Sequence, residues 1–416
     1  MGPQNALKDF AIAGAAETPA KSTGVYMAQA SRSTVALIAT TILAMLFLIR
    51  GTTHPGLNYD VIPYVALAKE MRSAGGKVEA YRELASQVGD SRFQLYVSGP
   101  YRERMYRDDQ FFQINQPLYT IRPFYIFLCS VVGAAIHDDV AATYIISASA
   151  AALAVLLSYV LAGSAGLTGN WRLAVPLTWI VAGGLDMAGL STPDAVETLL
   201  SLLFVLVSLR EPWGVVRATG LLLLAILMIA TRTDGLLFVV FLLLMEWMLA
   251  PRHRVISTLL LLGALSAYLV IERLSGNYGY VALLNFAFLD GPSRETVPNL
   301  VPNLAGYVRT FVHQTLQILG ESPQFTLLIP AVAALAFAWC RERRLSATLE
   351  RDTFNQRALI LSAALALCLI ARFILFPLPF SRYMMNAYVL AGILFARAIQ
   401  PPAGATQLSS ALSEAE

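Results

Sequence analysis

The chain alternates long apolar runs with short basic clusters, and this alternation constrains its fold more than any other feature. A helix that crosses a membrane needs about 20 apolar residues, and runs near that length recur along the 416 residues. Basic clusters at 210–217, 252–254 and 341–357 separate several of these runs. Only 14% of the residues are charged, against about 25% in soluble domains. The pattern therefore predicts an all-α polytopic membrane protein.

The apolar runs predict about ten transmembrane helices, with both termini on one side of the membrane. Lys and Arg in short loops resist translocation, so the side that carries the basic clusters is predicted to be cytoplasmic. The expected spans are 34–50, 141–162, 172–189, 193–210, 216–231, 234–250, 255–274, 324–340, 357–376 and 383–399. Disordered cytoplasmic tails are expected at 1–33 and 401–416, on either side of a membrane domain over 34–400.

One further apolar run, Pro123 to Ile136, leaves two interpretations open. It is only about 14 residues long, too short for an ordinary span. It follows Arg122 and stops at His137. If it crossed the membrane, every later basic loop would face outward, against the positive-inside bias. We therefore expect it to lie in the outer interface, with a crossing span as the alternative.

Two large outer loops are predicted, at about 51–140 and 275–323. Residues 51–120 of the first loop include eight basic and eight acidic side chains, so this loop is expected to form a polar layer with interfacial helices. In the second loop, 304–319 contains Arg309 and His313. That segment is too polar for a lipid-facing span and is expected to be an amphipathic helix.

The candidate functional residues all fall on the predicted outer side. Asp60 can cap a helix that begins beside it, or it can act as a general base. Tyr64, four residues on, would share its helix face. Asp194 and Asp234 each head an apolar helix, where the helix dipole favours an acid. Arg232 is a cation at such an N-terminus, so an anion such as a lipid phosphate would fit between it and the helix.

Arg382 repeats the arrangement of Arg232 before the last span, and binding of ordinary lipid headgroups is the alternative for both arginines. The acidic pairs Asp108-Asp109 and Asp138-Asp139 could bind a divalent cation through oxygen ligands, although solvated loop charge is the commoner role. The outward histidines lack the spacing of metal ligands, so no metal site is assigned. The net charge of +3 is spread over loops and predicts no nucleic-acid partner.

In their order and their common side, these segments resemble the glycosyltransferase C superfamily, and within it the bacterial relatives of protein O-mannosyltransferases and of the lipid A aminoarabinose transferase. The matching motifs are the acidic segment Asn58 to Ala66, Gln116-Pro117-Leu118-Tyr119 (similar to a Lys-Pro-Pro-Leu-Tyr-Tyr stretch), Asp194 heading a span, Thr231 to Gly235 (similar to a Thr-Lys-Gly turn) and Arg382-Tyr383 before the last span. Two departures stand out: Val61 replaces a second acidic residue, and Gln116 replaces a basic one.

The resemblance implies an inverting glycosyltransferase of the inner (plasma) membrane, with its active site on the periplasmic or exterior side. It would transfer a sugar from a polyprenyl-phosphate donor to a lipid, glycan or protein acceptor. Asp60 would be the catalytic base, while Arg232 and Arg382 would meet the phosphate. The remaining substrate-binding residues implied are Tyr64, Gln116, Tyr119, Asp194, Asp234 and Tyr383.

Two other classes remain as alternatives: a lipid or solute transporter, and a polysaccharide ligase or polymerase that uses a lipid-linked donor. Transporters usually carry ionisable groups and broken helices near the membrane midplane, often in repeated halves. In this chain we find neither mid-span charge clusters nor a repeat. A ligase or polymerase would be expected to have its large loop late in the chain. These features favour the transferase.

Overall fold

The computed structural model describes residues 19–72, 75–209, 213–285, 301, 303–321, 353–377 and 385–400, and these residues are almost entirely helical. Their only β pairing is an isolated parallel bridge between Gly56 and Leu190. The all-α prediction is therefore confirmed over the described ranges. The expected tail at 401–416 and the expected span at 324–340 lie outside them.

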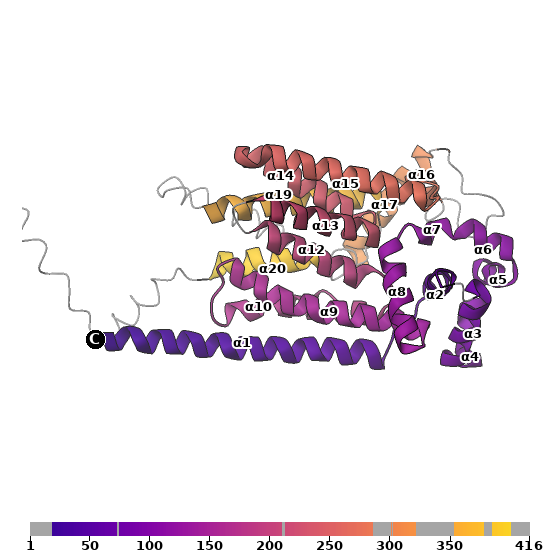
Figure 1. Cartoon of the computed structure of the whole chain (residues 1–416), viewed down its shortest axis with the longest axis horizontal. Helices are drawn as coiled ribbons and strands as arrows, with labels where there is room; N and C mark the ends of the chain where they lie inside the picture. The colour runs from indigo at the N-terminus through magenta and orange to yellow at the C-terminus, as the bar shows by residue number, and fades with distance from the viewer. Residues whose placement is uncertain are drawn as a thin grey trace, which may run out of the picture.

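Most of the long apolar helices run side by side in one bundle (Figure 1). Neighbouring pairs in contact include α1 with α9, α9 with α12, α12 with α13, α13 with α15, α14 with α15 and with α19, and α10 with α20. The helices of the bundle are α1 (Pro19–Thr53), α9 (Asp139–Ser164), α10 (Trp171–Val181), α12 (Asp194–Ser208), α13 (Val215–Thr231), α14 (Gly235–Leu249), α15 (Arg254–Leu274), α19 (Thr353–Leu375) and α20 (Met385–Ile399).

Three helical segments are long and apolar enough to cross a membrane: Ser33–Thr53 within α1, α9, and Pro251–Leu274, which includes α15. The other bundle helices contain shorter apolar segments, such as the 17 residues of α13, which would be about 26 Å long at 1.5 Å per residue. These helices are consistent with a membrane protein, and the count of ten spans stays a prediction.

Two expected boundaries differ from the structure. The run 172–189 is not one helix: α10 ends at Val181 and α11 (Gly184–Gly189) begins after Gly183. Gly183 has a φ of 77°, in the left-handed region that glycine enters without steric cost and that ends a helix. At the other end of the chain, α1 begins at Pro19, inside the stretch expected to be a disordered tail.

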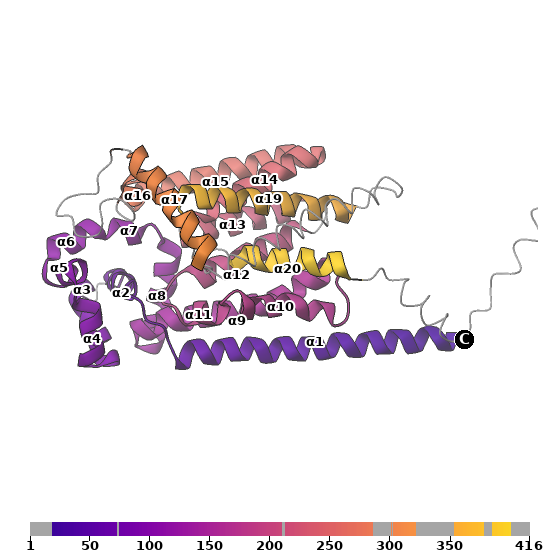
Figure 2. The same ribbon diagram turned by 180° about the vertical axis from the view of Figure 1, so that it is seen from behind.

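The first outer loop forms a layer of short helices at one end of the bundle, as Figures 1 and 2 show. We call this the end layer. It has an apolar core of its own, which includes Val61, Tyr81, Leu84 and Met105. The loop is therefore a folded layer, as its charge content predicted. Its helices are α2 (Val61–Glu70), α3 (Gly76–Val88), α4 (Asp90–Val97), α5 (Pro100–Arg107), α6 (Asp109–Asn115) and α7 (Pro117–Thr120).

Helix α8 (Pro123–Ile136) runs across the direction of the bundle helices, between the bundle and the end layer (Figure 2). It bends by 105° from the helical segment Asp109–Thr120 that precedes it. Packing against α2, α9 and α13 holds it there. Helix α8 therefore does not continue the direction of the bundle helices, and the interfacial position of 123–136 stays a prediction.

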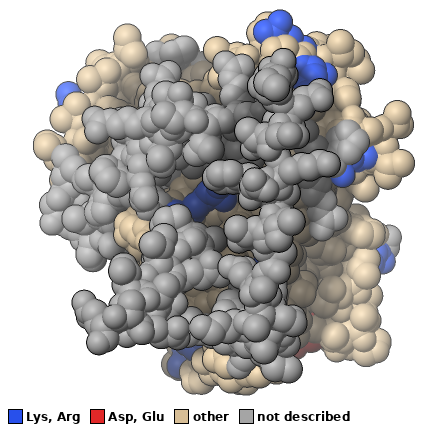
Figure 3. Space-filling model, turned by 90° about the vertical axis from the view of Figure 1, so that its left-hand side faces the viewer, with Lys and Arg blue, Asp and Glu red and all other residues tan. Residues whose placement is uncertain are grey.

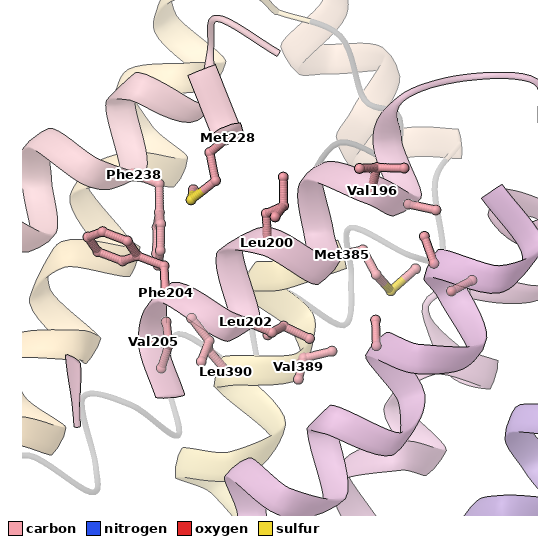
Figure 4. Close-up of a cluster of buried hydrophobic side chains, with 14 of the residues drawn as sticks. Val196, Leu200, Leu202, Phe204, Val205, Met228, Phe238, Met385, Val389 and Leu390 are labelled. Atoms are coloured by element: carbon pink, nitrogen blue, oxygen red, sulfur yellow. The ribbon is translucent and has the colours of Figure 1, made fainter. Parts of the chain in front are cut away.

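The bundle core is built from large aliphatic and aromatic side chains, and α12 is central to it. Figure 4 shows side chains of α12 facing those of α13, α14 and α20, among them Phe204, Met228, Phe238 and Val389. All four are fully or almost fully buried. Burial of one such side chain stabilises a soluble protein by about 1.5–3 kcal/mol. This packing holds α12, whose first residue is the candidate site residue Asp194, within the bundle.

Ion pairs attach the end layer to the bundle through the N-terminus of α9. The Nζ of Lys69 lies 2.6 Å from Glu83 and 2.7 Å from Asp139, and Arg72 lies 2.5 Å from Asp139. Glu83 also accepts the backbone N–H groups of Asp139 and Val140, at 2.5 and 3.0 Å. We call these residues of α2, α3 and α9 the clasp. It places a carboxylate at a helix N-terminus, where the dipole favours negative charge.

The opposite end of the bundle is basic. Figure 3 views that end and shows Lys and Arg atoms at several places and little acidic surface among the coloured atoms. Arg172 and Arg397 each donate to backbone carbonyls just beyond the C-terminus of α9, at Leu167 and Ala165. Cations are favourable there because the helix dipole is negative. Of the basic clusters that the sequence predicted on this side, 252–254 is described, whereas 210–212 and 341–352 lie outside the described residues.

The second outer loop is described in part. It contains α16 (Tyr280–Leu284) and α17 (Leu304–Glu321), which covers the segment expected to be an amphipathic helix. One side of α17 packs on α19, with the Phe311 and Phe373 rings 5.3 Å apart. Residues 286–300, 302 and 322–323 lie outside the described ranges.

Candidate functional site

Asp60 is the N-cap residue of α2, but its side chain does not cap the helix. Its carboxylate instead accepts a hydrogen bond from Asn58 Nδ2 at 3.1 Å and lies 3.4 Å from the hydroxyl of Tyr119. The side chain is half-buried. Of the two roles that the sequence left open, capping through the side chain is therefore not used, and the carboxylate remains available for other chemistry.

Two tyrosines and an arginine lie beside Asp60. Tyr64 and Tyr119 pack edge to face, with ring centroids 5.6 Å apart. The guanidinium of Arg122 donates to the Tyr64 hydroxyl and lies over both rings, 5.5 and 6.0 Å from their centroids. Burial raises the pKa of Tyr64 and of Tyr119 above the ordinary tyrosine value. Both hydroxyls therefore stay protonated at neutral pH and can donate hydrogen bonds.

Ion pairs join α12, the turn between α13 and α14, and α19 next to these tyrosines. Arg232 contacts Asp194 and makes two bonds to Asp234, at 3.0 and 2.9 Å. Arg372 of α19 reaches the same Asp234 carboxylate at 2.5 Å. Thr192 donates to Asp194 at 2.7 Å instead of capping α12. We call Asp194, Arg232, Asp234 and Arg372 the ion-pair ladder.

The ladder changes the interpretation of Arg232. The sequence indicated an unfavourable cation that needed an anion between it and a helix N-terminus. The structure supplies that anion twice from the chain itself, as Asp194 and Asp234. The Arg232 side chain is only 13% exposed, and Asp194 is 2% exposed. A phosphate would have to compete with two carboxylates for this arginine, which weakens its expected role as the main phosphate contact.

The end layer and the ladder lie close together, because α8 packs against both α2 and α13. The charges of Asp60, Asp194, Arg122 and Arg232 all act on the Tyr64 hydroxyl. Four separate parts of the chain therefore meet at the end of the bundle that carries the end layer. The structure brings together most of the predicted site residues: Asp60, Tyr64, Tyr119, Asp194, Arg232 and Asp234.

The other predicted residues do not join this cluster. Gln116 donates to both carboxylate oxygens of Glu70, at 2.9 and 3.0 Å, and so links α7 to the end of α2. That contact is structural and gives no support for substrate binding. Arg382 and Tyr383 lie outside the described residues.

Four site residues were missed as candidates. Arg122 directly precedes the apolar α8 and carries the same signal that singled out Arg232, a cation before a helix N-terminus. Glu197 is buried one turn after Asp194 and accepts from Ser201 at 3.0 Å. Arg372 is a single charge near the end of the apolar helix α19, with no motif around it. Asn58 stands in the acidic motif, and its buried Oδ1 has no hydrogen-bond partner.

The acidic pairs serve structural roles rather than a metal site. Asp108 and Asp138 accept helix-capping bonds from the backbone N–H groups of Phe111 and Ala141. Their neighbours pair with cations: Asp109 with Lys77, and Asp139 within the clasp. No group of three or more His, Cys, Asp or Glu side chains is arranged to hold a metal ion among the residues that the structure describes.

Comparison with known proteins adds no relative: no protein-family model, no curated protein and no solved structure matches the chain.

Proposed function

We propose that this protein is a membrane glycosyltransferase that moves a sugar from a polyprenyl-phosphate donor to an acceptor hydroxyl at the outer face. The main support is the state of Asp60. Its carboxylate has no ion-pair partner and no helix-capping bond among the described residues, yet it lies beside a cluster of arginines at the end of a bundle. A half-buried carboxylate of this kind is suited to accept a proton.

The proposed reaction is one displacement with inversion. The acceptor oxygen attacks the anomeric carbon of the donor sugar while its proton passes to an oxygen of Asp60. The bond between the anomeric carbon and the phosphate oxygen breaks, and its electron pair stays on the leaving phosphate. Arginines near the site would stabilise the charge that grows there, because preoriented cations act most strongly where charge develops.

A transporter without glycosyl transfer is the second candidate class. Transport sites usually lie near the midplane, at broken helices. Here the ionic groups of the site lie at helix ends: Asp194 is the first residue of α12, Asp234 is the N-cap of α14, and Arg372 is in the last turn of α19. This placement favours surface chemistry over a path through the bundle.

Release of undecaprenyl phosphate tests the proposal. The full chain in lipid nanodiscs would be incubated with undecaprenyl-phosphate hexoses and pentoses and an envelope extract as acceptor. Every transfer releases the same lipid phosphate, whatever the acceptor. Asp60→Asn should lower the release rate by about 100-fold or more, in line with loss of a general base. Asp90→Asn is the matched control, because Asp90 is an exposed acid of the end layer.

Two results would contradict the proposal. One is a wild-type release rate from folded Asp60→Asn protein. The other is movement of intact donor across sealed vesicles with no cleavage of the sugar–phosphate bond, which would identify a transporter.

A further inference from the structure

Some charged groups of the site form ion pairs and others do not. Arg232 and Arg372 are both engaged by the carboxylates of the ladder. Arg122 has no carboxylate within ion-pair distance among the described residues. Asp60 is the complementary case, an acid with no cation in contact. The site therefore holds one cation and one carboxylate that lack ionic partners and do not contact each other.

The groups in contact with Arg122 supply no negative charge. It contacts the neutral phenols of Tyr64 and Tyr119, which offer a hydrogen bond and ring faces but no negative charge. Among the charges that act on it without contact, Arg232 repels Arg122 and Asp60 attracts it. Arg122 is also the N-cap residue of α8, with Pro123 as the first helical residue, so the helix dipole opposes it. A bound anion would offset the repulsion by Arg232 and the helix dipole, and it would give Arg122 the ionic contact that its neighbours do not provide.

The chemistry of the site favours a phosphate group as that anion. A guanidinium binds two oxygens of a phosphate through parallel N–H bonds. The Tyr64 hydroxyl accepts from Arg122 and still carries its own proton, because burial raises its pKa. It can therefore donate to a third oxygen. Since α8 crosses between the bundle and the end layer, a phosphate at Arg122 would lie at the level where a lipid headgroup meets the protein.

We infer that Arg122, with the Tyr64 hydroxyl, binds the phosphate of the lipid-linked donor, while Asp60 faces the acceptor. Both groups adjoin the same pair of tyrosines: Arg122 donates to the Tyr64 hydroxyl and lies over both rings, and the Tyr119 hydroxyl lies 3.4 Å from Asp60. Next to Asp60, the Oδ1 of Asn58 has no hydrogen-bond partner and can accept a hydrogen bond from a hydroxyl of the acceptor. The lipid part of this assignment rests on the proposed function, whereas the phosphate part rests on the contacts of Arg122.

A binding measurement that needs no turnover tests the assignment. The full chain in nanodiscs would be titrated with undecaprenyl phosphate, with undecaprenol and with inorganic phosphate, and binding followed by native mass spectrometry. Arg122→Gln should weaken undecaprenyl phosphate binding about 10- to 100-fold, the usual effect of losing hydrogen bonds to a charged group. Undecaprenol should bind wild type and Arg122→Gln alike. Arg92→Gln is the matched control, because Arg92 is an exposed cation of the same layer.

A second, conservative variant tests the assignment if Arg122→Gln does not fold. Arg122→Lys retains the charge but cannot form the bidentate hydrogen bonds of a guanidinium. Its affinity for undecaprenyl phosphate should therefore fall between those of Arg122→Gln and wild type. Unchanged affinity in the folded variants would overturn the assignment. Inorganic phosphate that binds as tightly as undecaprenyl phosphate would overturn its lipid part.

The two proposals fail separately. Arg122-dependent binding without any release of undecaprenyl phosphate would refute the glycosyl transfer and leave the phosphate site standing. Release that depends on Asp60 but is unaffected in Arg122→Gln would refute the phosphate site and leave the transfer standing.

Discussion

The clasp that attaches the end layer to the bundle makes a quantitative prediction for Asp139→Asn. The Asp139 side chain is 5% exposed and contacts two cations, Lys69 at 2.7 Å and Arg72 at 2.5 Å. Asparagine has nearly the same shape, so the packing stays and only the charge is lost. The backbone N–H of Asp139 keeps its bond to Glu83 in the variant.

The size of the effect follows from what the two cations retain. Removing one partner of a buried ion pair costs about 3–5 kcal/mol. Lys69 keeps its pair with Glu83 at 2.6 Å, and Arg72 is 27% exposed, so water can hydrate it. We therefore expect a smaller loss, about 2–3 kcal/mol, confined to the attachment of α2 and α3. At about 1.4 kcal/mol for each factor of ten, this raises the population of the detached end layer roughly 30- to 150-fold.

Hydrogen–deuterium exchange of the protein in nanodiscs measures that population directly. Amides of α2 and α3 should exchange faster by the stated factor in Asp139→Asn, while those of α14 should be unchanged. Asp138→Asn is the control at the adjacent position, because the Asp138 oxygen that accepts from Ala141 and from Gln87 of α3 is kept as the amide oxygen of asparagine, which caps equally well. Equal exchange in the two variants would refute the view that the clasp holds the end layer.

Two further predictions concern packing and pH. Gly51→Ala should destabilise the bundle by about 1–3 kcal/mol, because a Cβ there would lie 2.6 Å from the Ala188 carbonyl oxygen and 2.7 Å from Ala148 Cβ. Gly220→Ala is the control, because the space there is open, and it should be neutral or stabilising. Equal melting temperatures of the two variants would contradict this prediction. Burial raises the pKa of Tyr64, so its stabilising contribution is complete below the unfolded pKa of about 10 and is lost as the pH rises above that value. Tyr64→Phe should therefore show a shallower fall in melting temperature between pH 9 and 11 than wild type, and parallel curves would argue against a buried phenol.

The arrangement of the site could be predicted where it depends on position along the chain. The basic loops predicted one common side for Asp60, Asp194, Arg232 and Asp234. The reason is that each span crosses the membrane, so every second connection lies on the same side. The spacing of four residues placed Tyr64 near Asp60. Both inferences use only the helical period and the number of spans between two residues, which can be counted in the sequence. They are borne out by contacts among the described residues.

The pairing of charges could not be predicted, because it depends on distances between segments. Arg232 and Arg122 give the same local signal, a cation before a helix N-terminus. Only the fold shows that Asp194, 38 residues away in the chain, pairs with Arg232. It also shows that Arg122 donates to the hydroxyl of Tyr64, which carries no charge. The break at Gly183 was missed for a related reason: the apolar run continues through it, and a run of hydropathy does not reveal one left-handed residue.

Under the proposed function, Asp60 and Arg122 match the movement of charge in the reaction. The acceptor proton neutralises Asp60 as the leaving phosphate gains one negative charge, so the total charge of the site is constant while negative charge moves toward Arg122. An unpaired carboxylate at the start of this path and an unpaired cation at its end both favour that movement. It follows that Arg122→Glu should slow transfer more than Arg122→Gln, because it reverses the field rather than removing one source of it. Equal rates in the two variants would place the leaving phosphate elsewhere.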